Sequence, residues 1–141
     1  MKATVHFVEL SEEQRQEIND NGWGCEIGMA YMDIRFKGIV NETNRHLFKK
    51  AAVMNSNSSE TVWRSLQNLE MGWDAKREIE CFTTFPRSMD VGDVIVWEDG
   101  SAEMCCSVGF GHFDASLLYP PKAVGIQAAR ERLAQEEPGF S

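Results

Sequence analysis

One run of sequence decides the fold of this chain: Asp93-Val94-Ile95-Val96-Trp97-Glu98-Asp99-Gly100-Ser101-Ala102-Glu103-Met104-Cys105-Cys106-Ser107-Val108. Two β-prone segments, 93–98 and 101–108, flank Asp99-Gly100, a dipeptide that favours the two-residue type I′ turn of a β-hairpin. A two-residue loop would place Trp97 opposite Ala102, Ile95 opposite Met104 and Asp93 opposite Cys106. Ile95, Trp97, Ala102, Met104 and Cys106 then share an apolar face, whereas Val94, Val96, Glu98, Ser101, Glu103 and Cys105 form a half-polar one. The pattern predicts an antiparallel sheet covered on one side.

The segments before the hairpin predict one more strand and one short helix. Alternating apolar residues over Lys2–Leu10 indicate a strand. Ser11 and Gln14 form a capping box, so we expect a helix from there to about Asn19, ending at Asp20-Asn21-Gly22. Residues 22–28 are rich in glycine and indicate a loop around Trp23. The segment Met29–Phe36 fits a strand or a helix equally well.

The middle and the end of the chain predict three helices and one strand. Helices are expected at Asn41–Val53, Glu60–Leu69 and Lys122–Glu136, and a strand at Ile79–Phe85, closed by Pro86. The resulting fold class is α+β: a small antiparallel sheet, with a β-hairpin in its C-terminal half, packed against three to four helices. We expect a single domain over residues 1–141, with parts at 1–58, 59–114 and 115–141.

The composition is that of a globular domain. The chain has 141 residues, of which 43% are hydrophobic and 26% charged, so it is long enough to bury a core of its own. No apolar run approaches the length of a membrane helix, and the N-terminal residues do not resemble a secretory signal. We therefore expect a cytoplasmic protein, bacterial or made in a phage-infected cell, that does not contact a membrane. Its four irregularly spaced cysteines predict reduced thiols, and no motif indicates a metal or another cofactor.

The charge is concentrated in one segment. Of the formal net charge of −8, residues 78–114 carry −7, since Arg87 is the only base among eight acids. A protein that binds a phosphate backbone normally carries a basic footprint, so we expect no direct nucleic-acid binding. The partner is expected to be another protein.

Residues 60–113 carry a resemblance to a known family. Arg87-Ser88-Met89-Asp90-Val91-Gly92-Asp93-Val94 is followed by a hairpin and by Gly109-Phe110. This arrangement resembles the YodL-like domain, a small module of bacterial mobile elements with relatives in phages. The chain departs from the family pattern at Asp90, where the family has serine, and at Cys105-Cys106-Ser107. The resemblance implies a mobile-element or phage setting; the family has no established activity, so no chemistry follows from it.

Two small groups of residues are candidates for chemistry. Arg87, Ser88 and Asp93 would grip a ligand, or would build the turn that enters the sheet; we favour the turn, because turn chemistry accounts for each of them. Cys105 or Cys106 with His112 is the one Cys/His combination that is close in sequence, and Cys105 would be a thiolate if His112 folded back beside it. Cys106, assigned to the apolar face, is expected to be inert. No catalytic residue is assigned.

These observations favour a noncatalytic accessory protein of phage or mobile-element type that binds another protein and acts against a host factor. Glu98, Asp99 and Glu103 are the candidate contact residues, because carboxylates on a rigid hairpin can occupy a basic site on a partner. The alternative is a small ligand-binding or enzymatic module that uses the Arg87–Asp93 turn or the Cys105/His112 pair. An exposed apolar or acidic patch would favour the first hypothesis, and a cavity between the hairpin and helix 60–69 the second.

Overall fold

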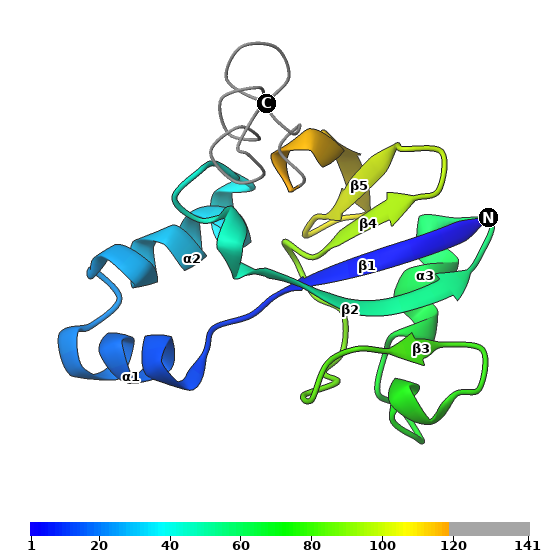
Figure 1. Ribbon diagram of the computed structural model, residues 1–141, viewed down its shortest axis with the longest axis horizontal. Coiled ribbons are helices and arrows are strands. Elements are labelled where there is room, and N and C mark those ends of the chain that lie inside the picture. Colours follow the sequence, from blue (N-terminus) through cyan, green and yellow to red (C-terminus); the bar gives the residue numbers. More distant parts are fainter. Residues whose placement is uncertain (119–141) are drawn as a thin grey trace, which may run out of the picture.

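Strand β1 (Lys2–Val8) lies inside an antiparallel sheet that organises the molecule (Figure 1). The computed structural model describes residues 1–118. Over these residues the sheet has six strands in the order β3-β2-β1-β4-β5-β6, so the short strands β3 and β6 form its two edges. The strands are β2 (Phe48–Asn55), β3 (Glu80–Cys81), β4 (Val94–Trp97), β5 (Ala102–Cys105) and β6 (Phe110–Phe113). Together with three helices, this sheet confirms the predicted α+β class.

Both faces of the sheet are covered, which corrects the expectation of a sheet with one wet face. One core cluster combines Ala3, Val5 and Phe7 of β1 with Ile95 and Trp97 of β4, under helix α3 (Ser59–Ser65). The other combines Val94 and Met104 with Ile34 of helix α2 (Glu26–Lys37). Alternate side chains of β4 therefore enter different cores, and both are apolar.

The hairpin is present, but its register differs by one residue from the predicted one. Val94 lies opposite Met104, Ile95 opposite Glu103 and Val96 opposite Ala102. The loop has three residues, 98–100: the Trp97 amide donates to the Ser101 carbonyl at 2.8 Å, and Gly100, at φ 92°, donates to the Trp97 carbonyl at 2.9 Å. This is the type I turn with a glycine bulge that three-residue hairpins use. A one-residue change of register moves each side chain of the second strand to the other face.

The predicted helix Asn41–Val53 is wrong. A 3₁₀ turn (Arg45–Leu47) leads directly into strand β2, which pairs with β1 on one side and β3 on the other. Val5 pairs with Ala52 and His6 with Lys50, so Ala51 is an extra residue in β2, and Ala51 and Ala52 are both buried in the core cluster under α3. This bulge breaks the alternation of a strand, so the apolar residues resembled a helical stripe. The turn before it is held by Asn44, which is fully buried and donates to the carbonyls of Ala30 and Ile39.

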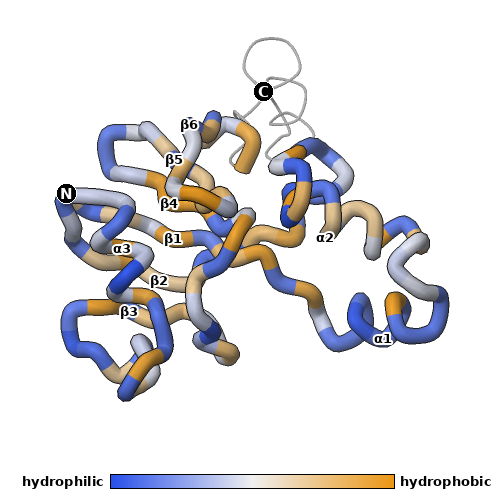
Figure 2. Tube along the Cα trace, turned by 180° about the vertical axis from the view of Figure 1, so that it is seen from behind, coloured by the Kyte–Doolittle hydropathy of each residue, from blue (hydrophilic) through white to orange (hydrophobic). Residues whose placement is uncertain are grey.

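The segment Met29–Phe36, for which the sequence allowed a strand or a helix, is helical and belongs to α2. Helix α1 (Glu12–Asn21) begins at the predicted capping box of Ser11 and Gln14 and ends before Gly22. Helix α2 ends at Gly38, whose φ of 66° is left-handed; Gly38 donates to the Ile34 carbonyl and Ile39 to the Asp33 carbonyl. This pair of bonds is a Schellman motif, which terminates α-helices. Figure 2 shows α1 as largely hydrophilic and α2 beside it as more hydrophobic.

Two other predicted elements are shorter than expected. Helix α3 ends at Ser65 rather than at Leu69, which lies in the following loop and is exposed. The strand predicted over 79–85 is reduced to Glu80–Cys81, which pairs with Val53 and Ala52. Two more 3₁₀ turns, Trp73–Ala75 and Ala115–Leu117, complete the described part. The predicted helix Lys122–Glu136 and the Pro120-Pro121 joint lie outside the described residues.

Candidate functional site

The carboxylate of Asp93 is the centre of the motif Arg87–Asp93. Asp93 immediately precedes β4, and its exposed fraction is 0%. It accepts hydrogen bonds from the backbone amides of Val8, at 2.9 Å, and Asp90, at 2.8 Å. Arg87 donates to both of its oxygens, at 2.7 and 2.9 Å. Each carboxylate oxygen of Asp93 therefore accepts two hydrogen bonds from protein donors, so the buried charge is fully hydrogen-bonded.

The guanidinium of Arg87 is equally committed to the protein. Besides Asp93, it donates to the carbonyls of Ser88 and Val8, both at 2.9 Å, and it stacks over the ring of Phe7 at 4.3 Å. Burial opposes the charged form of Arg87, but the hydrogen bonds and charge of Asp93 outweigh it, so the pKa of Arg87 is raised. The pair fastens strand β1 to the entrance of β4, through both Nη atoms of Arg87 and both carboxylate oxygens of Asp93.

A second arginine completes this buried cluster. Nη1 of Arg35, on α2, lies 3.7 Å from Oδ1 of Asp93 and donates to the Val91 carbonyl, while its Nε donates to the Tyr31 hydroxyl at 2.9 Å. Arg35 was missed in the sequence because it lies 58 residues before its partner and α2 was not assigned as a helix. Its signal was weak, since Arg35 is one of two charged residues in the mostly apolar run Met29–Phe36.

Ser88 lies beside the pair but faces another segment. Its hydroxyl oxygen accepts from the backbone amide of Asn68 at 2.8 Å, and the Asn68 side chain donates to the Pro86 carbonyl at 2.7 Å. The Trp73 amide in turn donates to Asn68 at 3.0 Å, so the loop after α3 is tied to the motif. The contacts of Arg87, Ser88 and Asp93 favour the turn interpretation over ligand binding.

The environments of Cys105 and Cys106 are the reverse of those predicted, in which Cys106 lay on the apolar face and Cys105 on the half-polar one. Cys105 is buried and faces the α3 core, whereas Cys106 is exposed. Burial and, next, the negative charge of Asp93 raise the pKa of Cys105 to about 11, so this thiol stays protonated at neutral pH. In the β5–β6 register Cys105 lies opposite Phe110, and His112 lies opposite Glu103. Cys105 is therefore a protonated, buried thiol, and its environment does not favour a nucleophilic thiolate.

The three candidate contact acids lie at one end of the sheet but differ in their environments. Glu98 accepts from the backbone amide of Lys2, and Asp99 accepts from the amide and hydroxyl of Ser101, which lowers its pKa. Glu103 is half-buried and accepts from the Trp97 indole at 3.0 Å and from the Ser59 hydroxyl. Glu98 and Asp99 therefore face solvent in the hairpin loop, whereas Glu103 links the hairpin to α3.

One hollow lies between the hairpin and α3. It has a volume of about 400 Å³, opens to solvent, and is lined by Trp63, Gln67, Ser88, Met89, Asp90, Val91, Cys105, Cys106 and Ser107. Trp63 is partly exposed, and the Gln67 side chain spans the hollow to the Met89 carbonyl at 3.2 Å. This is the place where the sequence argument located the cavity of a ligand-binding module.

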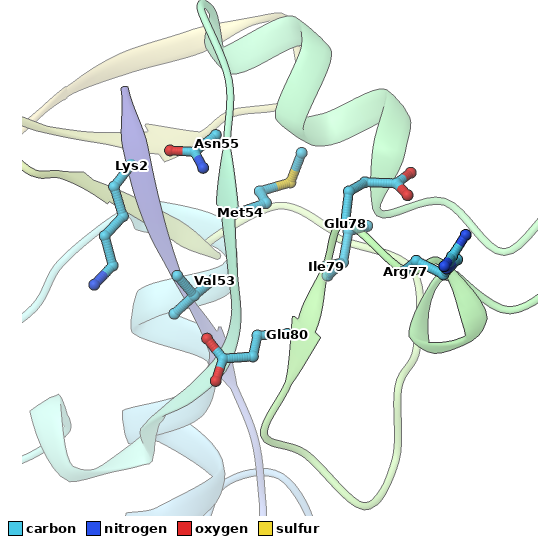
Figure 3. A pocket seen from close by; sticks show the side chains of 8 residues that line it. All are labelled: Lys2, Val53, Met54, Asn55, Arg77, Glu78, Ile79 and Glu80. Atoms are coloured by element: carbon cyan, nitrogen blue, oxygen red, sulfur yellow. The ribbon is translucent and has the colours of Figure 1, made fainter.

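A second hollow, of about 390 Å³, lies where β2 extends past β3 (Figure 3). Lys2 and Arg77 stand on opposite sides of it, with the edge of the sheet between them. The acids Glu78 and Glu80 also line it, so its charges balance. This balance gives no preference for a cationic or an anionic ligand.

Residues 1–118 hold neither a cluster of metal ligands nor a membrane-spanning helix. No three His, Cys, Asp or Glu side chains in this range gather closely enough to hold a metal ion. No helix among the same residues has the length and apolarity to cross a membrane. The chain matches no protein-family model, no curated protein and no solved structure. The YodL-like resemblance of residues 60–113 therefore stays a prediction.

Proposed function

We propose that the protein is a noncatalytic accessory protein that acts by binding another protein, with Glu98 and Asp99 of the hairpin loop at the contact. The mobile-element or phage setting, and action against a host factor, follow from the resemblance of residues 60–113 alone. The partner is a protein with a basic surface, since the loop offers carboxylates at a fixed spacing. Glu103 has a supporting part, because it fixes the hairpin to α3.

One observation carries the proposal: the negative charge of residues 78–114 is not neutralised. Among the eight acids of this segment, Asp93 is paired with Arg87 and Arg35; the other seven form no ion pair with a residue in 1–118. The Glu98 amide donates to the Lys2 carbonyl at 2.9 Å, and Asp114 follows Phe113, which lies opposite Ala102, so Asp114 lies at the same end of the sheet as the loop. Unneutralised carboxylates on rigid backbone steer association with a basic partner.

The experiment is affinity capture with charge-matched variants. The immobilised protein is incubated with a bacterial lysate, and the retained proteins are identified by mass spectrometry and then measured singly by calorimetry. Glu98→Gln/Asp99→Asn removes two charges from the loop; Glu70→Gln/Asp74→Asn removes two exposed charges elsewhere and serves as the control. We expect a partner that the wild type and the control bind, that the loop variant binds at least tenfold more weakly, and whose affinity falls with salt. Equal retention of every captured protein by both variants would contradict the proposal.

The hollow beside Trp63 favours a second candidate, a small ligand-binding module. Its volume is within the range of small-molecule sites, and an indole beside polar groups is a common lining. A thermal-shift screen of metabolites, repeated on Trp63→Ala, tests it. Stabilisation of the wild type by a compound that leaves Trp63→Ala unchanged would support this candidate. A screen in which every active compound stabilises both proteins equally would count against it.

A further inference from the structure

Helix α2 presents large apolar side chains on two opposite sides. Its inner side packs through Ile34, which is fully buried, and through Ile27, Ala30 and Tyr31, which are partly buried against the same core cluster. Its outer side carries Met29, Met32 and Phe36 at the spacing i, i+3, i+7. Their exposed fractions are 54%, 36% and 77%, and the flanking Trp23 and Ile39 are exposed by 51% and 44%. We name Met29, Met32 and Phe36 the α2 stripe.

The fold itself does not require the α2 stripe. Helix α2 is anchored by its inner residues and by the ion pair and hydrogen bonds of Arg35, and over residues 1–118 the stripe is exposed apolar surface outside the two core clusters. A row of exposed apolar residues on one helix is typical of an interaction surface. Methionine is common on surfaces that accept an apolar helix, because its side chain adapts to the partner.

Helix α1 lies beside α2 and adds negative charge. The two helices contact each other, and Figure 1 shows them at the opposite end of the molecule from the β4–β5 loop. Ile18 is the buried residue of α1, so the rest of this helix faces solvent almost all round. Glu13, Glu17 and Asp20 follow each other at i, i+4 and i+7, and none of them forms an ion pair with a residue in 1–118.

We propose that the α1–α2 hairpin binds an amphipathic helix with a basic polar face, contributed by a partner protein. The apolar face of that helix packs on the α2 stripe, and its lysines or arginines meet the acids of α1. A second copy of this chain fits poorly, because it would bring one acidic α1 against another. Residues 115–141 also lack the complementary charge, since their three bases are balanced by three acids. This surface is independent of the hairpin loop and of the function proposed above.

The experiment uses a synthetic probe. An 18-residue leucine–lysine peptide with helical periodicity is titrated into the full-length protein by calorimetry, beside the same peptide with glutamate in place of lysine. We expect the lysine peptide to bind and the glutamate peptide not to bind. Met29→Ser/Phe36→Ser should weaken binding at least tenfold, whereas the control Phe85→Ser/Val108→Ser, which alters exposed apolar residues elsewhere, should not. Glu13→Gln/Glu17→Gln should weaken it severalfold and reduce its salt dependence, whereas Glu98→Gln/Asp99→Asn should not.

Four results would overturn the proposal. The first is equal binding of the lysine peptide by the wild type and Met29→Ser/Phe36→Ser. The second is loss of binding in Glu98→Gln/Asp99→Asn, which would place the peptide at the hairpin loop. The third is a dimer in sedimentation that Phe36→Ser dissociates, which would make a second copy the occupant. The fourth is a melting temperature lowered by several degrees in Met29→Ser/Phe36→Ser, which would mean that the chain itself covers the stripe.

Discussion

Arg87 holds Asp93 through two hydrogen bonds of 2.7 and 2.9 Å, six residues apart in the chain and at the junction of two strands. Because Asp93 also accepts from the Val8 amide and Arg87 donates to the Val8 carbonyl, the pair joins β1 to β4 independently of the sheet hydrogen bonds. Arg35 connects helix α2 to the same carboxylate. Three segments that are distant in sequence thus meet at one buried charge.

Loss of the Asp93 charge should destabilise the protein strongly. Asp93→Asn leaves the partly buried guanidinium of Arg87 without its counter-ion. The Arg87 side chain is 32% exposed, so we expect a loss of about 2–3 kcal/mol, below the roughly 3–5 kcal/mol of a fully buried pair. Urea denaturation of the two proteins measures the difference in unfolding free energy. Asp90→Asn is the control, since Asp90 is exposed and, among residues 1–118, its carboxylate accepts from the neighbouring Val91 amide and forms no ion pair. Similar stabilities for the two variants would show that the pair does not support the fold.

A side chain at the glycine of the hairpin loop should destabilise the protein moderately. Gly100 has a φ of 92° and no atom within 4 Å of an added Cβ, so Gly100→Ala tests backbone conformation alone. A left-handed conformation costs an L-residue about 1–2 kcal/mol, and we expect that loss in unfolding free energy. Gly24 is equally open, and its φ is not left-handed, so Gly24→Ala should change stability by less than about 0.5 kcal/mol. A type I′ loop at Asp99-Gly100 would instead have required positive φ at both residues.

Acid should destabilise the fold through His6. Burial, and then the charge of Lys50, lower the pKa of His6 to about 4. Between pH 6.5 and 4 the unfolded chain therefore takes up a proton that the folded protein excludes, so stability is complete above pH 6.5 and decreases below it. The full loss amounts to about 3 kcal/mol. Unfolding free energies at pH 7, 5.5 and 4.5 should fall more steeply for the wild type than for His6→Gln; parallel profiles would contradict this assignment.

The adjacent thiols should react at different rates. Cys106 is exposed, whereas Cys105 is buried with a pKa raised to about 11, so an alkylating reagent at pH 7.5 should modify Cys106 first. Timed alkylation followed by tandem mass spectrometry distinguishes the two, and Cys106→Ser should remove the fast reaction from this pair. In denaturant the rates should become similar. Faster modification of Cys105 in the folded protein would mean that it faces solvent.

Local chemistry determined several parts of this protein in the sequence itself. The side chains of Ser11 and Gln14 form hydrogen bonds with backbone amides at the start of α1, so the helix begins there. Asp99-Gly100 allows the chain to reverse direction, so a hairpin forms at that point. The alternating apolar residues of Lys2–Val8 likewise form a strand. These local features were sufficient to predict the α+β class.

Only the tertiary structure decided which way the side chains face and which charges meet. One extra loop residue moved Cys105 into the core and Cys106 into solvent, since neighbouring positions of a strand point to opposite faces. Strand β2 was mistaken for a helix because the bulge at Ala51 interrupts its alternating pattern. The partnership of Arg35 with Asp93 depends on the packing of α2 against the sheet. Contacts between residues that are distant in the chain do not change the local sequence pattern around either residue, so the pattern does not predict them.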